Sequence, residues 1–365
     1  MTTKPAIRAE AERLYAAFLA AGAAPVDADI LLPADTMLDL YGEDIRARAY
    51  VTHDPLRGEM MLRPDFTVPV VQAHMAHGAD PARYAYMGEV FRKQDHLGPR
   101  ASEYLQVGFE VFDRDAPEAA DAEVFALFAD CLHRLPLRAV TGDIGILMAA
   151  VRGLDTTPRR KAALLRHIWR PNRFRALLDR FAGRAPMPPA RAQLLERLAK
   201  GSPSELIAQA APLIGLRGED EIVARAAALI EDADAKPIAA PAAALLYDLL
   251  NLQAPAQSAL EHLRGITPLL PAIEAAVDRF ATRLEALKSR GIDTAALPFE
   301  ASLGRTTMEY YDGFTFAFIG PADLPPVASG GRYDALTAVL GQGKSIPAVG
   351  GIIRPNLVVA LKGVA

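Results

Sequence analysis

The sequence lacks the features on which secreted, membrane-spanning and metal-dependent proteins rely. It contains one cysteine, Cys131, in 365 residues, so no intrachain disulfide is possible, and no Cys-x-x-Cys pair could hold zinc. No apolar run reaches the ~18 residues that a membrane-spanning helix needs, and the N-terminus has no apolar signal region. These absences predict a cytoplasmic protein with no metal site and no cofactor.

An excess of positive charge is also missing. There are 40 Lys and Arg residues against 44 Asp and Glu, and the isoelectric point is near 6.0. A protein that mainly coats nucleic acid needs a strongly basic surface, so that class is disfavoured, although a local basic patch is still allowed. The length fits about two domains, or one large domain with an insertion.

Strand signals gather at the two ends of the chain, and the middle is helical. Apolar spacing predicts helices over residues 6–21 and 117–134. The runs with strand character are Ala49–His53, Met60–Arg63, Tyr84–Lys93, Glu103–Asp113, Leu137–Val140, Phe299–Leu303, Phe314–Ile319, Val327–Gly331 and Ala348–Ile353. We therefore predict one α+β core, formed by residues 1–150 and 265–365, that is interrupted by a helical insertion over residues 151–264.

A basic cluster lies near the start of the helical middle. Its members are Arg159, Arg160, Lys161, Arg166, Arg170, Arg173 and Arg175. Such a cluster is most often a solvated helix face. A surface for a partner or an anion is the alternative, and the sequence leaves both open.

The two strands on either side of residues 94–102 predict an antiparallel hairpin. Side chains alternate along a strand, so Gln106, Gly108 and Glu110 share one face. A glycine inside a strand often marks the close approach of a ligand. With Arg92 from the first strand, this face could hold a small zwitterion: a guanidinium for its carboxylate, an amide and a carboxylate for its N–H groups. A solvent-exposed polar sheet face is the simpler alternative.

Several segments resemble, in the correct order, those of histidyl-tRNA synthetases. They are Leu62–Thr67 (LRPDFT), Tyr86–Arg92 with Leu105–Glu110 (YMGEVFR, LQVGFE), Glu309–Phe316 (EYYDGFTF), Ser329–Asp334 (SGGRYD) and Pro347–Gly350 (PAVG). The resemblance implies a class II aminoacyl-tRNA synthetase-like fold, an antiparallel sheet flanked by helices. Because the chain ends soon after Gly350, we expect no anticodon-binding domain and no tRNA partner.

The same resemblance implies a pocket for the amino acid histidine. It assigns Asp65, Thr67 and Gln106 to the ammonium group, Arg92 to the carboxylate, and Glu110, Tyr310 and Tyr311 to the imidazole ring. A carboxylate and a phenol on opposite sides of the ring can recognise both ring nitrogens, and so reject amino acids that lack them.

The positions that serve ATP in the synthetases differ here. The family's motif 2 glutamate is replaced by Gln94, its catalytic arginine by Thr306, with Arg305 one residue out of place, and its motif 3 arginine by Leu357. Loss of arginine removes bidentate, charge-assisted phosphate binding. Activation of the amino acid should therefore be slower by orders of magnitude.

A histidine pocket without its ATP arginines resembles the regulatory subunits of short-form ATP phosphoribosyltransferase, the first enzyme of histidine biosynthesis. This implies a non-catalytic subunit that assembles with the short catalytic subunit and mediates feedback by L-histidine. The resemblance also implies a homodimer, formed around Leu31–Pro33, within a hetero-oligomer. Two alternatives stay open: an active histidyl-tRNA synthetase, and a synthetase-like scaffold that binds only a protein partner.

Overall fold

The computed structural model describes most of the chain. The described residues are 3–35, 48–94, 101–210, 215, 218–305, 310–321 and 324–363. The helices are α1 (Lys4–Ala20), α4 (Thr67–His77), α5 (Pro117–Leu132), α6 (Ile144–Arg152), α7 (Pro158–Arg166), α8 (Pro171–Phe181), α9 (Pro189–Lys200), α10 (Pro203–Ala208), α11 (Glu219–Asp234), α12 (Ala240–Asn251), α13 (Ala256–Ile266), α14 (Glu274–Ser289), α15 (Asp334–Leu340) and α16 (Pro355–Lys362). No helix in these ranges is long and apolar enough to cross a membrane.

The strands form one large and one small sheet. They are β1 (Ala24–Pro25), β2 (Leu31–Pro33), β3 (Val51–Asp54), β4 (Gly58–Leu62), β5 (Ala82–Phe91), β6 (Glu103–Phe112), β7 (Arg138–Asp143), β8 (Gln253–Pro255), β9 (Pro298–Glu300), β10 (Phe314–Ile319), β11 (Ala328–Arg332) and β12 (Ala348–Ile353). The large sheet has the order β1-β5-β6-β12-β11-β10-β7-β9-β8, and the small one the order β2-β4-β3.

The large sheet is mixed, so the prediction of an antiparallel sheet holds only for its central part. From β5 to β7 every neighbouring pair is antiparallel. Near the edges β1 runs parallel to β5 and β9 parallel to β7. Parallel neighbours need a long crossover connection, and both pairs have one: the small sheet and α4 separate β1 from β5, and the helical middle separates β7 from β9.

The β5–β6 hairpin confirms the predicted pairing, and its register defines two faces. Val107 and Phe109 are fully buried on one face, where the ring of Phe18 from α1 lies 5.4 Å from that of Phe109. Glu110 lies on the other face and is paired with Gly350 of β12. One face of the sheet thus forms the main core with α1, α5 and α16, and the other is left for polar side chains.

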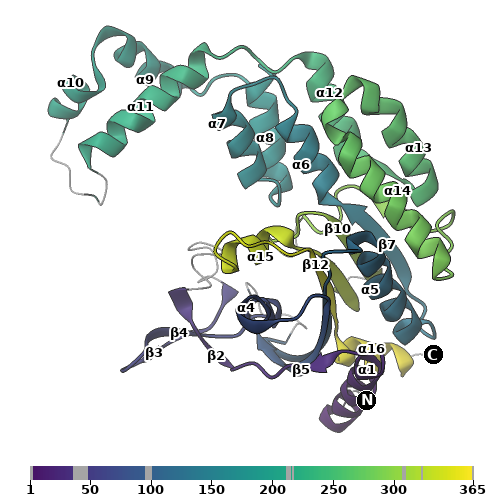
Figure 1. The fold of residues 1–365 in the computed structure, drawn as a ribbon. Coiled ribbons are helices and arrows are strands. Elements are labelled where there is room, and N and C mark those ends of the chain that lie inside the picture. The colour runs from purple at the N-terminus through teal and green to yellow at the C-terminus, as the bar shows by residue number, and fades with distance from the viewer. Residues whose placement is uncertain are drawn as a thin grey trace.

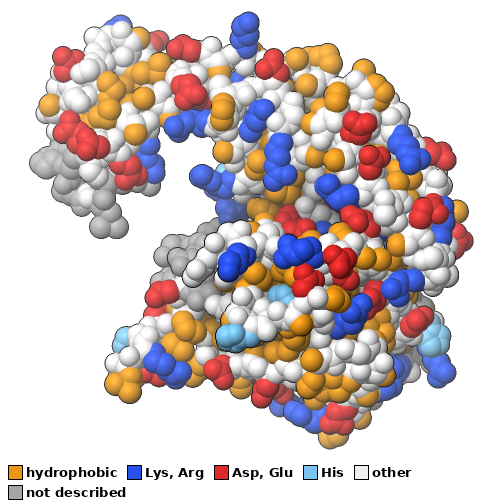
Figure 2. Space-filling view, in the orientation of Figure 1, with side chains coloured by type: hydrophobic (Ala, Val, Ile, Leu, Met, Phe, Trp, Pro, Cys, Tyr) orange, Lys and Arg blue, Asp and Glu red, His pale blue; other side chains and the backbone are white. Residues whose placement is uncertain are grey.

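Helices α7 to α11 form an arm that extends away from the sheet, and α12 to α14 lead back to it (Figure 1). The outer helices of the arm bury little, since α9 buries only Leu198, α11 only Ala228, and α10 no residue, whereas the buried apolar residues of α7 and α8 belong to the main core. Figure 2 shows a hollow between the arm and the sheet, with Lys and Arg side chains along the inner edge of the arm. The predicted domain boundaries at residues 150 and 265 stay predictions.

Candidate functional site

A cavity of about 570 Å³ opens on the polar face of the sheet. Such a volume is typical of small-molecule sites. All seven residues expected from the sequence line it: Asp65, Thr67, Arg92, Gln106, Glu110, Tyr310 and Tyr311. The fold brings them together because β6 carries two of them, the start of α4 and the end of β5 lie alongside, and the segment before β10 closes the opposite wall.

Glu110 is the most enclosed acid of the cavity wall, with no exposed surface. Its Oε1 accepts hydrogen bonds from Thr67 Oγ1 at 3.1 Å and from the Tyr86 hydroxyl at 2.9 Å, and its Oε2 accepts from the Tyr333 hydroxyl at 2.6 Å. Burial nevertheless raises the pKa of Glu110 to about 7. A carboxylate has about four acceptor positions, so one remains for an N–H donor of a ligand.

Two strand glycines make room for this arrangement rather than for a ligand. A Cβ atom on Gly108 would overlap the ring of Tyr86, and one on Gly350 would overlap the carboxylate of Glu110. The prediction that Gly108 marks the close approach of a ligand is therefore wrong: the space is filled by Tyr86, which the sequence analysis had not placed in the site.

Asp65 and Gln106 offer unused hydrogen-bonding atoms to the cavity. Both side chains are buried, at 4% and 1% exposure. Oδ1 of Asp65 and both amide atoms of Gln106 have no partner among the described residues. Burial raises the pKa of Asp65, while the positive charge of Arg92 and hydrogen bonds from the backbone N–H groups of Val68 and Thr67 oppose this. Buried polar groups are nearly always hydrogen-bonded, so Asp65 and Gln106 are suited to bind a polar ligand.

The cavity lining also carries cationic side chains. They belong to Arg92, Arg48, Lys93 and Arg354. Arg92 is oriented by a hydrogen bond from its Nε to the carbonyl of Pro64 at 2.8 Å, and Arg354 donates from Nη1 to the carbonyl of Pro326 at 2.6 Å. Burial lowers the pKa of Arg354. Arg354 was not predicted from the sequence, although its position directly after β12, the neighbour of β6, was a usable signal.

Tyr310 and Tyr311 form the remaining wall, with ring centroids 4.9 Å apart. The Tyr310 hydroxyl donates to Thr67 Oγ1 at 3.3 Å, so Thr67 is engaged on both sides, by Tyr310 and Glu110. Burial and the nearby Glu110 raise the pKa of Tyr311, which stays a neutral phenol. The indole N–H of Trp169, between α7 and α8, donates to the Tyr311 carbonyl at 3.1 Å, which joins the base of the arm to the cavity wall.

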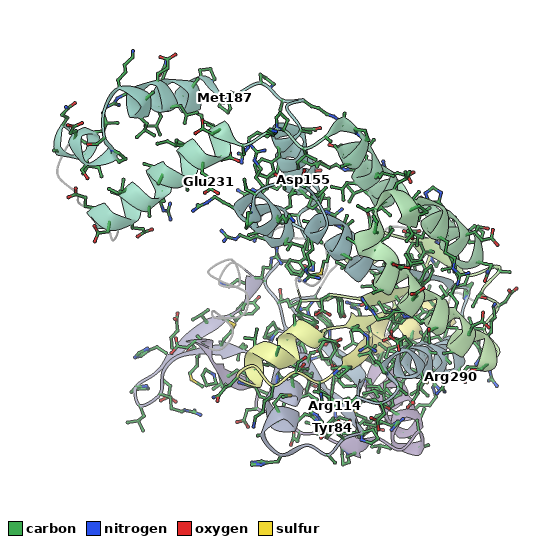
Figure 3. All side chains as sticks on the ribbon, turned by 45° about the horizontal axis from the view of Figure 1, so that its top comes forward. Tyr84, Arg114, Asp155, Met187, Glu231 and Arg290 are labelled. Carbon is green, nitrogen blue, oxygen red and sulfur yellow. The ribbon has the colours of Figure 1, made fainter. Side chains whose placement is uncertain are left out.

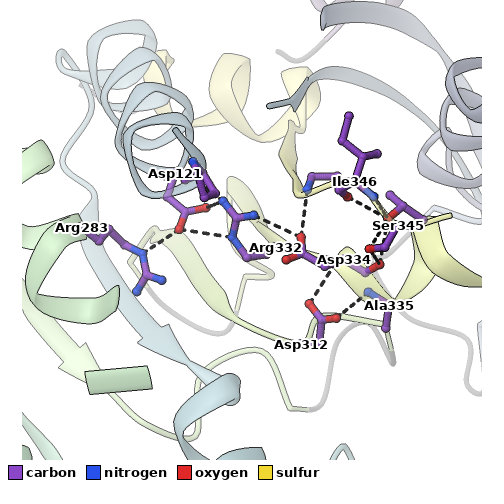
Figure 4. Close-up of polar contacts among 11 residues, drawn as sticks. Asp121, Arg283, Asp312, Arg332, Asp334, Ala335, Ser345 and Ile346 are labelled. Atoms are coloured by element: carbon purple, nitrogen blue, oxygen red, sulfur yellow. Dashed lines mark hydrogen bonds and ion pairs between the residues drawn. The ribbon is translucent and has the colours of Figure 1, made fainter. Parts of the chain in front are cut away.

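A buried network of charged side chains lies next to the segments that carry Tyr311 and Tyr333 (Figure 4). Arg332, the neighbour of Tyr333, donates to Asp121 at 2.7 Å, and Asp121 also pairs with Arg283 at 2.7 Å. Asp312 accepts backbone N–H groups at the start of α15, and burial, with the nearby Asp334, raises its pKa to about 7. The network holds the segments before β10 and after β11 in one place.

Comparison with known proteins identifies the fold and the family. The model of the histidyl-tRNA synthetase family matches residues 4–250 and 219–356. The ATP phosphoribosyltransferase regulatory subunit of Mesorhizobium japonicum is 32% identical over all of both chains. That of Brucella anthropi is 33% identical over 89% of both chains. The chain belongs to the histidyl-tRNA synthetase-like family of ATP phosphoribosyltransferase regulatory subunits.

Solved structures agree with this family in fold. An ATP phosphoribosyltransferase regulatory subunit/histidyl-tRNA synthetase from Bacillus halodurans superimposes with a TM-score of 0.68 at 20% identity, covering 98% of this chain and 79% of the other. The histidyl-tRNA synthetase of Nostoc sp. superimposes with a TM-score of 0.62 at 14% identity, covering 98% and 71%.

The positions at which this regulatory-subunit chain differs from the ATP-binding motifs of the synthetases do not all lie in the cavity. Gln94 and Leu357 line the cavity, whereas Thr306 lies outside the described residues. Arg305 does not take the place of an arginine at 306, because it points toward the arm: its Nε donates to the carbonyl of Ile168 at 2.6 Å, and its guanidinium lies 5.1 Å from the Phe174 ring centroid.

Proposed function

We propose that this chain is the non-catalytic regulatory subunit of an ATP phosphoribosyltransferase, and that free L-histidine bound in the cavity is its effector. Family membership supports the first part of the proposal. The observation that carries the second is a set of three buried atoms beside Glu110 that have no partner among the described residues: Oδ1 of Asp65 and both amide atoms of Gln106. Three buried polar atoms without a partner are costly, so they favour a ligand that satisfies them.

The charges along the cavity fit the polarity of a free amino acid. Asp65 Oδ1 and Gln106 Oε1 are acceptors for an ammonium group, and Gln106 Nε2 is a donor for a carboxylate. Arg92, whose positive charge acts on Asp65, adds a guanidinium to the cavity lining, and its planar donor pair matches a carboxylate.

The imidazole of histidine then lies between Glu110 and Tyr311. One ring N–H donates to the remaining acceptor position of Glu110, and the phenol of Tyr311 serves the second nitrogen. An amino acid without two ring nitrogens would leave Glu110 or Tyr311 without its partner on the ligand. A site built to hydrogen-bond a ligand rejects analogues that lack the bond by large factors.

Feedback requires that histidine binds two states of the enzyme complex with different affinities. Such coupling free energies are typically ~1–3 kcal/mol. A sensor must also release its ligand at ordinary cellular concentrations, so we expect a dissociation constant of about 1–100 μM, or roughly −8 to −5.5 kcal/mol.

Co-expression with the short ATP phosphoribosyltransferase of the same organism tests the proposal. We expect the two chains to co-purify, the catalytic chain to be active only in the complex, and histidine to inhibit it. Calorimetry with histidine and histidinol, which lacks the carboxylate, measures the pocket directly. Activity without this chain, or no histidine binding to chain or complex, would contradict the proposal.

Two further assays separate the alternatives. Histidine-dependent exchange of pyrophosphate into ATP would establish a synthetase, and we expect none. A complex that needs this chain but is insensitive to histidine would indicate a scaffold. We also propose a homodimer formed around β2, within the larger complex, which light scattering of the separate chain would measure.

A further inference from the structure

A second cavity, of about 220 Å³, lies within the arm, between α7, α8, α9 and α11. Its charged lining is Arg159, Arg160, Arg180, Arg191, Arg225 and Asp232. It shares no residue with the cavity on the sheet. The basic cluster read from the sequence is thus divided, and only its first two arginines belong to this site.

Among the residues that the structure describes, Asp232 is the only acid that lines the arm cavity, and two arginines already bond to it. Arg160 donates to it from Nε at 2.6 Å and also to backbone carbonyls of Asp232 and Lys236. Arg191 donates to its second oxygen. The remaining three arginines therefore lack a charge partner inside the cavity.

Arg180 is the least satisfied of them. Its Nε is buried and has no partner among the described residues, and its guanidinium lies 4.7 Å from the centroid of the Phe181 ring. Burial lowers the pKa of Arg180, and the neighbouring Arg191 and Arg160 lower it further, against the effect of Asp232. Like charges held together in this way gain most from an anion placed between them.

Arg159 and Arg225 stand at the rim with weak partners of their own. Arg159 lies 3.7 Å from Glu231 and Arg225 lies 3.1 Å from Glu221, and all four side chains are about half exposed or more. Exposed pairs of this kind contribute little, so both arginines are available to a stronger anion. Figure 3 marks Glu231 on α11, at the side that faces α7.

We propose that the arm cavity binds the phosphate or diphosphate group of a small phosphorylated compound. Guanidinium forks match phosphate oxygens in pairs, and Phe181, Ala228 and Leu229 supply an apolar wall. The volume exceeds the ~10–15 Å³ that one water molecule needs. The site is independent of the histidine pocket and of its proposed role.

Calorimetry on the full chain with inorganic phosphate and inorganic pyrophosphate tests this site. We expect saturable binding, tighter for pyrophosphate and weaker at high salt. Arg180→Gln and Arg191→Gln should each weaken it by about tenfold or more, the usual effect of losing a charge-assisted pair. Arg197→Gln is the matched control, because Arg197 lies on α9 like Arg191 but is exposed and outside the cavity.

Further measurements separate binding in the arm cavity from misfolding and from binding in the first cavity. Arg225→Gln changes an exposed side chain, so it should weaken binding without affecting folding, and circular dichroism checks every variant. Histidine should not compete with pyrophosphate, and Arg354→Gln in the first cavity should leave pyrophosphate binding unchanged. No saturable binding, or binding that survives Arg180→Gln, Arg191→Gln and Arg225→Gln alike, would overturn the proposal.

Discussion

The hydroxyl of Tyr333 donates to Glu110 at 2.6 Å and so joins two segments 223 positions apart in the chain. Tyr333 belongs to the Gly-Gly-Arg-Tyr-Asp segment after β11, and Glu110 lies on β6. With Tyr86 and Thr67 it fixes the carboxylate from three sides. A carboxylate that is held in one orientation accepts a hydrogen bond from an N–H group of the ligand in one direction only. Recognition of an imidazole ring requires such a contact.

Glu110→Ala and Tyr311→Phe should both weaken the binding of histidine. Glu110→Ala removes the acceptor for one ring nitrogen and leaves three hydroxyls unsatisfied, so we expect a loss of about 100-fold, near 3 kcal/mol. Tyr311→Phe removes one hydroxyl and should cost about tenfold. Titration calorimetry measures both.

The matched control for the tyrosine is Tyr247→Phe on α12, because the Tyr247 hydroxyl donates to Asp179 and neither residue lines the cavity. It should leave the histidine affinity within about twofold, as expected for an independent site. Unchanged affinity in Glu110→Ala and Tyr311→Phe would mean that histidine binds elsewhere.

The raised pKa of Glu110 predicts a stability that falls as the pH rises. Its pKa moves from 4.5 to about 7 on folding, mainly by burial. Such a carboxyl contributes its full stability below pH 4.5, where it is protonated in both states, and this contribution is lost as the pH rises through about 7. The loss for this group is up to about 3 kcal/mol.

Urea unfolding of wild type and Glu110→Gln between pH 5 and 8 measures this effect. The difference in unfolding free energy between the two proteins should shift in favour of the variant as the pH rises. Asp312 also has a pKa raised to about 7, so Asp312→Asn is measured in parallel to separate the two groups. A pH-independent difference between wild type and Glu110→Gln would refute the assignment.

The sequence predicted the elements well because strand and helix signals were local. β12 was predicted over the residues it occupies, and the hairpin of β5 and β6 to within a few residues. The parallel edge pairs were missed because β1 and β9 are only two and three residues long. Their direction is set by distant segments rather than by their own residues.

The residues of the site could be predicted from sequence motifs, whereas the side chains that pack around them could not. Motif order named seven of the residues that line the cavity, but nothing local shows that the Tyr86 ring fills the space above Gly108, or that Arg305 turns toward α8. Those outcomes depend on which side chains meet across the sheet. Arg354 was missed for the same reason, since its role follows from the neighbouring position of β12 and β6.

Arg305→Met should raise the stability and leave histidine binding unchanged. Arg305 is 1% exposed, its Nη1 and Nη2 have no partner among the described residues, and burial lowers its pKa to about 10. Methionine removes two unsatisfied donors at the loss of one hydrogen bond to Ile168, so we expect a gain of about 1–2 kcal/mol. Chemical unfolding measures this.

Calorimetry on the same variant tests the direction of the Arg305 side chain. If Arg305 worked as a displaced catalytic arginine and faced the ligand, Arg305→Met would weaken histidine binding, contrary to our expectation. Arg305→Lys keeps a charge at the same place and should be less stable than Arg305→Met.

Asp121→Ala should cost both stability and histidine affinity, because Asp121 supports the cavity wall through Arg332. Asp121 is fully buried and pairs with Arg283 and Arg332, each at 2.7 Å. Removing one partner of a buried pair typically costs 3–5 kcal/mol, and because Arg283 keeps Asp143 and Arg332 keeps Asp334, we expect a loss near the lower end of this range. Glu300→Ala is the control, since its pair with Arg138 lies at the surface and should contribute below about 1 kcal/mol.

Because Tyr333 follows Arg332 directly, displacement of Arg332 would loosen the Tyr333 bond to Glu110. Histidine binding, measured at a temperature where the variant is folded, should therefore weaken in Asp121→Ala and not in Glu300→Ala. Equal affinities in the two variants would show that the network stabilises the fold without positioning the pocket.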